Sequence, residues 1–163
     1  MAGEIPTSAA RRRTLPPTGK KVSVIVLIDT DVLIDLALER DQYVDSAADL
    51  LDALERHPGI GFVAWHSIAN FYYLVAPRRG KADAKQFVLD LTAFVGISPT
   101  TTEHIRHAAQ LTMNDFEDAM QVAAAIACNA DVIATRNTRD YAKSPVPAAA
   151  PAAVVTRLST PSA

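Results

Sequence analysis

The sequence predicts a single α/β domain with three layers, α/β/α, around a central parallel sheet of four to five strands. The chain has 163 residues, of which 49% are apolar and 21% charged, enough for one globular core. Its first apolar run, 21–28, is almost continuously β-branched, as in a strand that is buried on both faces of a parallel sheet. Short apolar runs then alternate with segments of helical spacing, which is the pattern of parallel α/β folds.

The expected elements follow in chain order, and turn residues separate them. After the first strand they are helices over 31–40 and 44–56, a strand over 60–65, helices over 66–75 and 81–92, a strand over 94–97, helices over 103–113 and 116–128, and a strand over 131–134. Pro77 and Gly80 are predicted to separate the two middle helices. The Pro/Ala-rich end is expected to hold an edge strand near Val146 and a short turn over 151–155.

Charge divides the chain into an extension and a domain. Residues 1–20 are expected to be a disordered basic extension, 21–157 the folded domain, and 158–163 a flexible C-terminal tail. The first 21 residues hold five cations and one anion, which leaves 11 cations and 17 anions for the rest. An acidic domain is not built to bind nucleic acid nonspecifically, so metal ions or the basic extension would have to offset the repulsion.

Location is indicated by two further features. The chain has one cysteine, Cys128, so it forms no internal disulfide, as is usual in a reducing compartment. No apolar run approaches the length of about 18 residues that a membrane span needs. We therefore expect a soluble, cytoplasmic protein without membrane contact.

Polar residues that could carry chemistry follow the predicted strands or open the helices beside them. They are Asp29, Thr30 and Asp31 after the first strand, Asn70 after the second, Asp115, Glu117 and Asp118 before the fourth, and Thr135, Asn137 and Asp140 after it. In parallel sheets, ligands bind beyond the carboxyl ends of the strands, so these side chains are expected to converge there. Carboxylates without His or Cys favour Mg²⁺ or Mn²⁺.

Taken singly, several of these acids have ordinary structural explanations. Asp118 suits the first turn of a helix, where an acid stabilises the helix dipole, and Asp31 or Asp115 suits an N-cap. Asp29 differs, because it ends a buried strand, where an unpaired carboxylate is costly. Asp29 is therefore the strongest single indication of a functional site.

The opening stretch IDTDVL fits the first motif of the haloacid-dehalogenase-like phosphatases. In that family Asp29 would be the nucleophile and Asp31 the general acid. The family also needs a late Gly-Asp motif, whereas the last strand here is followed by TRNTRD. The similarity is therefore local.

The chain from about residue 24 to 155 resembles instead the PIN domain, a family of metal-dependent ribonucleases, in four blocks. These are VLIDTDVLID, WHSIANFYYL, DFEDAMQVAAAIACNA and DVIATRNTRDY, in the family's order. The resemblance implies that Asp29, Asp118 and Asp140 bind Mg²⁺ or Mn²⁺, with Asp115 as a further candidate. It places Asn70 and Asn137 in the catalytic set, and Thr30, Asp31, Thr135 and Glu117 in support of it.

The two asparagines weaken the implied site, because an amide oxygen can bind a metal but brings no negative charge. Asp115 and Glu117 could compensate for the two missing charges. Three hypotheses remain: a metal-dependent endoribonuclease, a dehalogenase-like phosphatase, and a PIN-fold protein with weakened activity that acts by binding. Small PIN proteins are commonly toxins of type II toxin–antitoxin pairs, so the resemblance further implies an RNA substrate, an antitoxin partner and a homodimer.

Overall fold

The structure, a computed structural model, describes residues 23–160 and contains one five-stranded sheet. The strands are β1 (Val26–Ile28), β2 (Gly61–Val63), β3 (Gly96–Ile97), β4 (Val132–Ala134) and β5 (Ala148–Ala149). They lie in the order β3-β2-β1-β4-β5, and every neighbouring pair is parallel. The predicted α/β class and central parallel sheet are confirmed.

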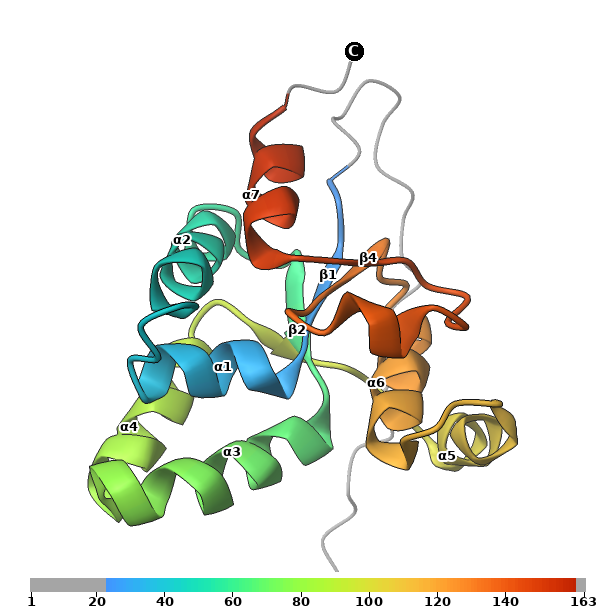
Figure 1. The fold of residues 1–163 in the computed structure, drawn as a ribbon, viewed down its shortest axis with the longest axis horizontal. Helices are drawn as coiled ribbons and strands as arrows, with labels where there is room; N and C mark the ends of the chain where they lie inside the picture. The colour runs from blue at the N-terminus through green and yellow to red at the C-terminus, as the bar shows by residue number, and fades with distance from the viewer. Residues whose placement is uncertain (1–22, 161–163) are drawn as a thin grey trace, which may run out of the picture.

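Helices cover both faces of this sheet (Figure 1). They are α1 (Thr30–Ala37), α2 (Val44–Glu55), α3 (Trp65–Arg79), α4 (Lys81–Leu91), α5 (Thr102–Gln110), α6 (Phe116–Ala127) and α7 (Pro151–Ser159), with a 3-10 helix, η1, at Thr138–Tyr141. In Figure 1, α1, α2 and α7 lie on one side of the strands, and α5 and α6 on the other. The three-layer α/β/α architecture is therefore confirmed.

The alternation of side chains along β1 explains the three layers. Val26 and Ile28 face the apolar core that contains the buried residues of α1, α2 and α3, whereas Leu27 faces the core formed with α6. Successive side chains of a strand point to opposite faces of the sheet. All three side chains are completely buried, because helices cover both faces. A strand in this central position needs apolar residues throughout, as the sequence has.

Two helix boundaries differ from the sequence-based predictions. The break predicted at Pro77 is wrong, because α3 continues through Pro77 to Arg79. Pro77 lies in the exposed last turn, where solvent can satisfy the carbonyl group that loses its donor, and Gly80 then ends the helix at φ 95°. The turn predicted over 151–155 is a nine-residue helix, α7, because Pro151 occupies its first turn, where the missing N–H costs nothing.

The structure covers the predicted domain and the start of the predicted tail, but not the predicted extension. The predicted extension, 1–20, lies outside the described residues. Helix α7 ends at Ser159, two residues beyond the predicted domain boundary, and residues 161–163 lie outside the described range. Within residues 23–160, no helix has the length and apolarity that a membrane crossing requires.

A buried carboxylate on α1 is neutralised by two arginines. Asp35 is 1% exposed, and its Oδ1 lies 2.9 Å from Nη1 of Arg40 and 3.2 Å from Nη1 of Arg136. Burial raises the pKa of Asp35, and the hydrogen bond from Arg40 and the charge of Arg136 oppose that rise. Arg136 also lies over the ring of Tyr43, 4.6 Å from its centroid. This cluster joins the segment after β4 to α1.

Replacing Arg136 with Met should lower the free energy of unfolding at pH 8 by about 2 to 3 kcal/mol, because Asp35 would keep only one of its two cations. Urea unfolding would measure the loss. The matched control is Arg106→Met, which removes an exposed ion pair with Glu103 and should change stability by less than about 1 kcal/mol. Equal losses in the two variants would contradict the importance of burial here.

Candidate active site

Three helix N-termini meet at the carboxyl edge of the sheet. Helix α1 begins directly after Asp29 at the end of β1, and α3 begins two residues after β2. Helix α6 packs on β1 and β4 and joins β4 by a short connection, so its first turn lies at this same edge. The positive ends of helix dipoles favour negative charge, which suits the acids gathered here.

A cavity of about 440 Å³ at this edge brings most of the predicted residues together. Its lining includes Asp29, Thr30, Asp31, Asn70, Asp115, Glu117 and Asp118. A neighbouring cavity of about 260 Å³ shares Asp115 and Asp118 with the first and adds Asp140, Arg139 and Lys143. Asp140 therefore faces Asp118 from the second cavity and does not line the one that contains Asp29.

Asp29 is the most buried acid of the set, at 4% exposure. Its Oδ2 accepts a hydrogen bond of 2.7 Å from Oγ1 of Thr135, a residue 106 positions later in the chain. Burial raises the pKa of Asp29 to about 7, against the lowering effect of that hydrogen bond, and the charges of Glu117, Asp31 and Asp118 add to the rise. The carboxylate is therefore held in a position where its charge is costly without a cation.

Asp118 lies in the first turn of α6. Its pKa is raised to about 6, mainly by burial and further by the charges of Asp115, Glu117 and Asp140, against the lowering effect of a hydrogen bond from Tyr141. Asp115 is the N-cap of this helix and accepts a hydrogen bond of 2.7 Å from the backbone N–H of Glu117. Capping thus fixes the first turn, and with it the position of Asp118.

Glu117 contacts side chains from three helices. Its Oε1 accepts a hydrogen bond from Nε2 of Gln121 (3.0 Å), and lies 3.1 Å from Nε2 of His66 and 3.4 Å from Oγ1 of Thr30. Burial alone would raise the pKa of Glu117, but hydrogen bonds from His66 and Gln121 outweigh it, and the pKa is lowered. Glu117 is thus stabilised in its charged form, unlike Asp29 and Asp118.

Gln121 belongs to this cluster but is not among the residues selected from the sequence. It is fully buried one turn after Glu117, and its Nε2 lies 2.9 Å from Oγ1 of Thr30 and 2.8 Å from Oγ of Ser67. Thr30 also donates to Ser67 (2.8 Å). The sequence does contain one signal for it, a single Gln among the small apolar residues of an Ala-rich helix. A buried amide requires polar partners, so such a residue indicates a polar cluster nearby.

Asp31 and Asn137 pair with each other. Nδ2 of Asn137 donates to Oδ2 of Asp31 at 2.8 Å, and Nη2 of Arg136 lies 3.6 Å from the same oxygen. Backbone N–H of Asn137 donates to Oγ1 of Thr135 (3.0 Å). The segment after β4 is therefore connected to both aspartates of the segment after β1.

The donor set fits a hard divalent cation. It consists of carboxylates, an amide and hydroxyls, and burial together with the repulsion between the acids raises the pKa values of Asp29 and Asp118. The buried hydroxyl of Tyr141 lies beside these two acids, and burial and their charges raise its pKa. No three acidic, His or Cys side chains in the described range are close enough to enclose an ion by themselves. Mg²⁺ does not need them to, because it keeps several waters and binds through one or two carboxylates.

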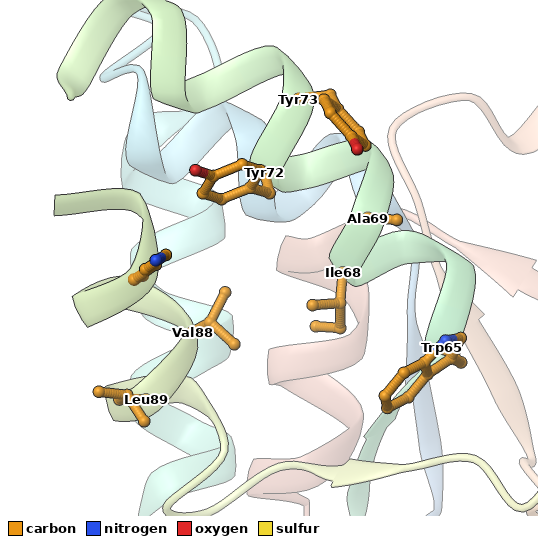
Figure 2. Close-up of a pocket in the computed structure, with 8 residues that line it drawn as sticks. Trp65, Ile68, Ala69, Tyr72, Tyr73, Val88 and Leu89 are labelled. Carbon is orange, nitrogen blue, oxygen red and sulfur yellow. The ribbon is translucent and has the colours of Figure 1, made fainter. Parts of the chain in front are cut away.

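An apolar groove of about 520 Å³ lies between α3 and α4 (Figure 2). Figure 2 shows Ile68 and Val88 facing each other across it, with Trp65 at one end and Tyr72 and Tyr73 toward the other. Trp65 is 72% and Tyr73 76% exposed. Tyr73 also lines the carboxylate cavity, so the groove and the candidate site adjoin at this residue.

Comparison with family models matches residues 25–139 to the PIN domain, and the chain belongs to this family. Comparison with curated proteins gave no match. The structure is similar to VapBC2 from Rickettsia felis, solved with a DNA fragment from its promoter (TM-score 0.61, 15% identity, 78% of this chain and 98% of that chain). It is also similar to FitAcB from Neisseria gonorrhoeae (0.58, 17%, 78% and 98%) and to VapC20 of Mycobacterium tuberculosis, described as a sarcin–ricin loop cleaving toxin (0.54, 16%, 66% and 86%). At these identities the likeness concerns the fold.

Proposed function

We propose that the protein is a metal-dependent endoribonuclease that acts in the cytoplasm as the toxin of a type II toxin–antitoxin pair. The observation that carries this proposal is the buried carboxylate of Asp29, held beside Asp118 with its pKa raised to about 7. A buried carboxylate charge without a cation destabilises the fold, whereas a bound cation would offset this free-energy cost. Membership of the PIN family supports the same reaction class.

Each residue has a defined part in this proposal. Asp29, Asp118 and Asp140, with Asp115, would hold Mg²⁺ or Mn²⁺, which supplies a hydroxide at neutral pH and stabilises charge on the phosphodiester. Thr135 orients Asp29, and Asn137 holds Asp31 in place. Asn70 offers an amide to the substrate or to a bound water.

Cations beside the site favour a polyanionic substrate. Arg139 and Lys143 line the cavity that contains Asp140, although residues 22–163 as a whole carry more acidic than basic side chains. They would contact the RNA backbone where it leaves the site, because phosphate contacts supply most of the affinity for nucleic acid.

The phosphatase alternative is less well supported. Its general acid would be Asp31, which is occupied by Asn137 and Arg136, partners that suit a carboxylate rather than a protonated acid.

The test is cleavage of a single-stranded RNA oligonucleotide by the full chain at millimolar Mn²⁺. Cleavage is expected, with loss on adding EDTA and recovery on adding excess Mn²⁺. p-Nitrophenyl phosphate serves as the control substrate and should not be hydrolysed. Intact RNA with turnover of the phosphomonoester would favour the phosphatase, and binding of RNA without any turnover would favour the protein with weakened activity.

The proposed antitoxin and homodimer need surfaces, and the groove between α3 and α4 suits the antitoxin. An apolar segment of a partner lying in this groove would reach the carboxylate cavity at Tyr73 and could obstruct it. A reading frame for a small DNA-binding protein directly upstream of this gene would support the pairing. Light scattering of the purified chain would give its oligomeric state.

A further inference from the structure

The edge of the cavity formed by α3 carries no carboxylate of its own. Helix α3, all of which is described, contains no Asp or Glu. Its contribution to the cavity is Asn70, an exposed and neutral amide, with Tyr73 and Leu74. If a cation is to be held between α1, α3 and α6, any negative charge on the α3 side must come from another element.

Glu117 brings a charge to that side from α6. His66, which contacts its carboxylate at 3.1 Å, lies on α3 one turn before Asn70. Thr30 and Gln121 bind the same oxygen, so the side chain is directed toward α1 and α3 instead of extending into solvent. Ser67 of α3 completes this arrangement through its contacts with Thr30 and Gln121.

The two oxygens of this carboxylate differ. The side chains of His66, Gln121 and Thr30 all contact Oε1, whereas no hydrogen bond among residues 23–160 involves Oε2. The side chain is 33% exposed and lines the cavity together with Asp29 and Asp118. A carboxylate with one oxygen fixed by the protein and the other left free is oriented as metal-binding carboxylates are, since their second oxygens are generally hydrogen-bonded.

We infer that Glu117 is a metal ligand of this site, which supplies from α6 the negative charge that Asn70 does not supply from α3. This inference rests on the proposed function and adds a residue to it. A purely structural link between α1, α3 and α6 would not require a charge, because the oxygen of a glutamine could accept the hydrogen bonds from His66 and Gln121.

Glu117→Gln tests the inference, because it removes the charge and keeps an acceptor for His66, Thr30 and Gln121. Titration calorimetry with Mn²⁺ alone should show a Kd about 10- to 100-fold higher than that of the unmodified chain. Adding Asn70→Glu to this variant returns a carboxylate to the α3 side and should recover most of the affinity. Glu55→Gln, an exposed position on α2 away from the cavity, is the control for net charge and should leave the Kd within about twofold.

The possible results separate the inference from the proposed function. If the unmodified chain binds Mn²⁺ and Glu117→Gln binds it equally well, Glu117 is not a ligand, and the proposed function stands. A Kd that stays high in the double variant contradicts the stated relation between Glu117 and Asn70. If the unmodified chain neither binds Mn²⁺ nor cleaves RNA, the inference and the proposed function both fail.

Discussion

Asp29→Asn is expected to lower the rate of Mn²⁺-dependent RNA cleavage about 1000-fold or more while the fold is retained. The amide keeps an oxygen that can accept the hydrogen bond from Thr135, but it has no charge with which to hold a cation. A 1000-fold loss corresponds to about 4 kcal/mol of transition-state stabilisation. Initial rates on an RNA oligonucleotide at saturating Mn²⁺ would measure it.

The same substitution should leave the metal-free protein at least as stable at pH 8 as the unmodified chain, because it removes a buried charge. Thermal unfolding in EDTA would show this as an unchanged or higher Tm. Asp52→Asn, at an exposed position on α2, is the control and should change neither cleavage nor Tm appreciably. Near-normal cleavage by the Asp29 variant would contradict the assignment of the site.

The metal-free protein is expected to lose stability as the pH rises from about 4 to about 7. The pKa of Asp29 is raised from 3.8 to about 7 and that of Asp118 to about 6, so the folded state binds protons that the unfolded chain has released. Stability from these groups is therefore greatest at low pH and falls until Asp29 is ionised. For Asp29 the loss is roughly 4 kcal/mol, or of the order of 10 °C in Tm for a domain of this size.

Mn²⁺ should oppose this loss. Binding requires ionised carboxylates, so the ion should raise Tm strongly at pH 8 and little at pH 5, where protons compete for the same oxygens. Thermal unfolding in EDTA and in Mn²⁺ at both pH values would measure the difference. Asp29→Asn should lose most of the pH dependence, and a metal-free Tm that rises from pH 5 to pH 8 would contradict the raised pKa values.

The sequence predicts this fold well because its central strand is unambiguous. The run 22–28 is apolar except for Ser23, which suits a strand covered on both faces. Asp29 follows at its carboxyl end, where parallel sheets bind ligands. The errors occur where local signals compete with packing. Pro77 and Pro151 were both interpreted as interruptions, yet one lies in the last turn of a helix and the other in the first.

The sequence predicts that the residues of the candidate site lie close together, but it does not predict their contacts. The positions of Asp29 and Asp118 at one cavity follow from strand and helix order. That Glu117 turns toward His66 and not into solvent depends on the meeting of the first turns of α6 and α3 at the edge of the sheet. Gln121 was missed for the same reason, since its partners lie 54 and 91 residues away and no local pattern identifies them.

The pairing of β1 with β4 has a consequence for synthesis of the protein. β1 is made early, yet its neighbour β4 and the hydrogen bond from Thr135 to Asp29 come from residues translated 106 positions later. A nascent chain that has left the ribosome only as far as α5 lacks both α6 and the partner of Asp29. Contacts so distant in sequence also slow folding. The candidate site is therefore incomplete until nearly all of the domain has been translated, so under the proposed function a growing polypeptide would have no ribonuclease activity while it is still being made.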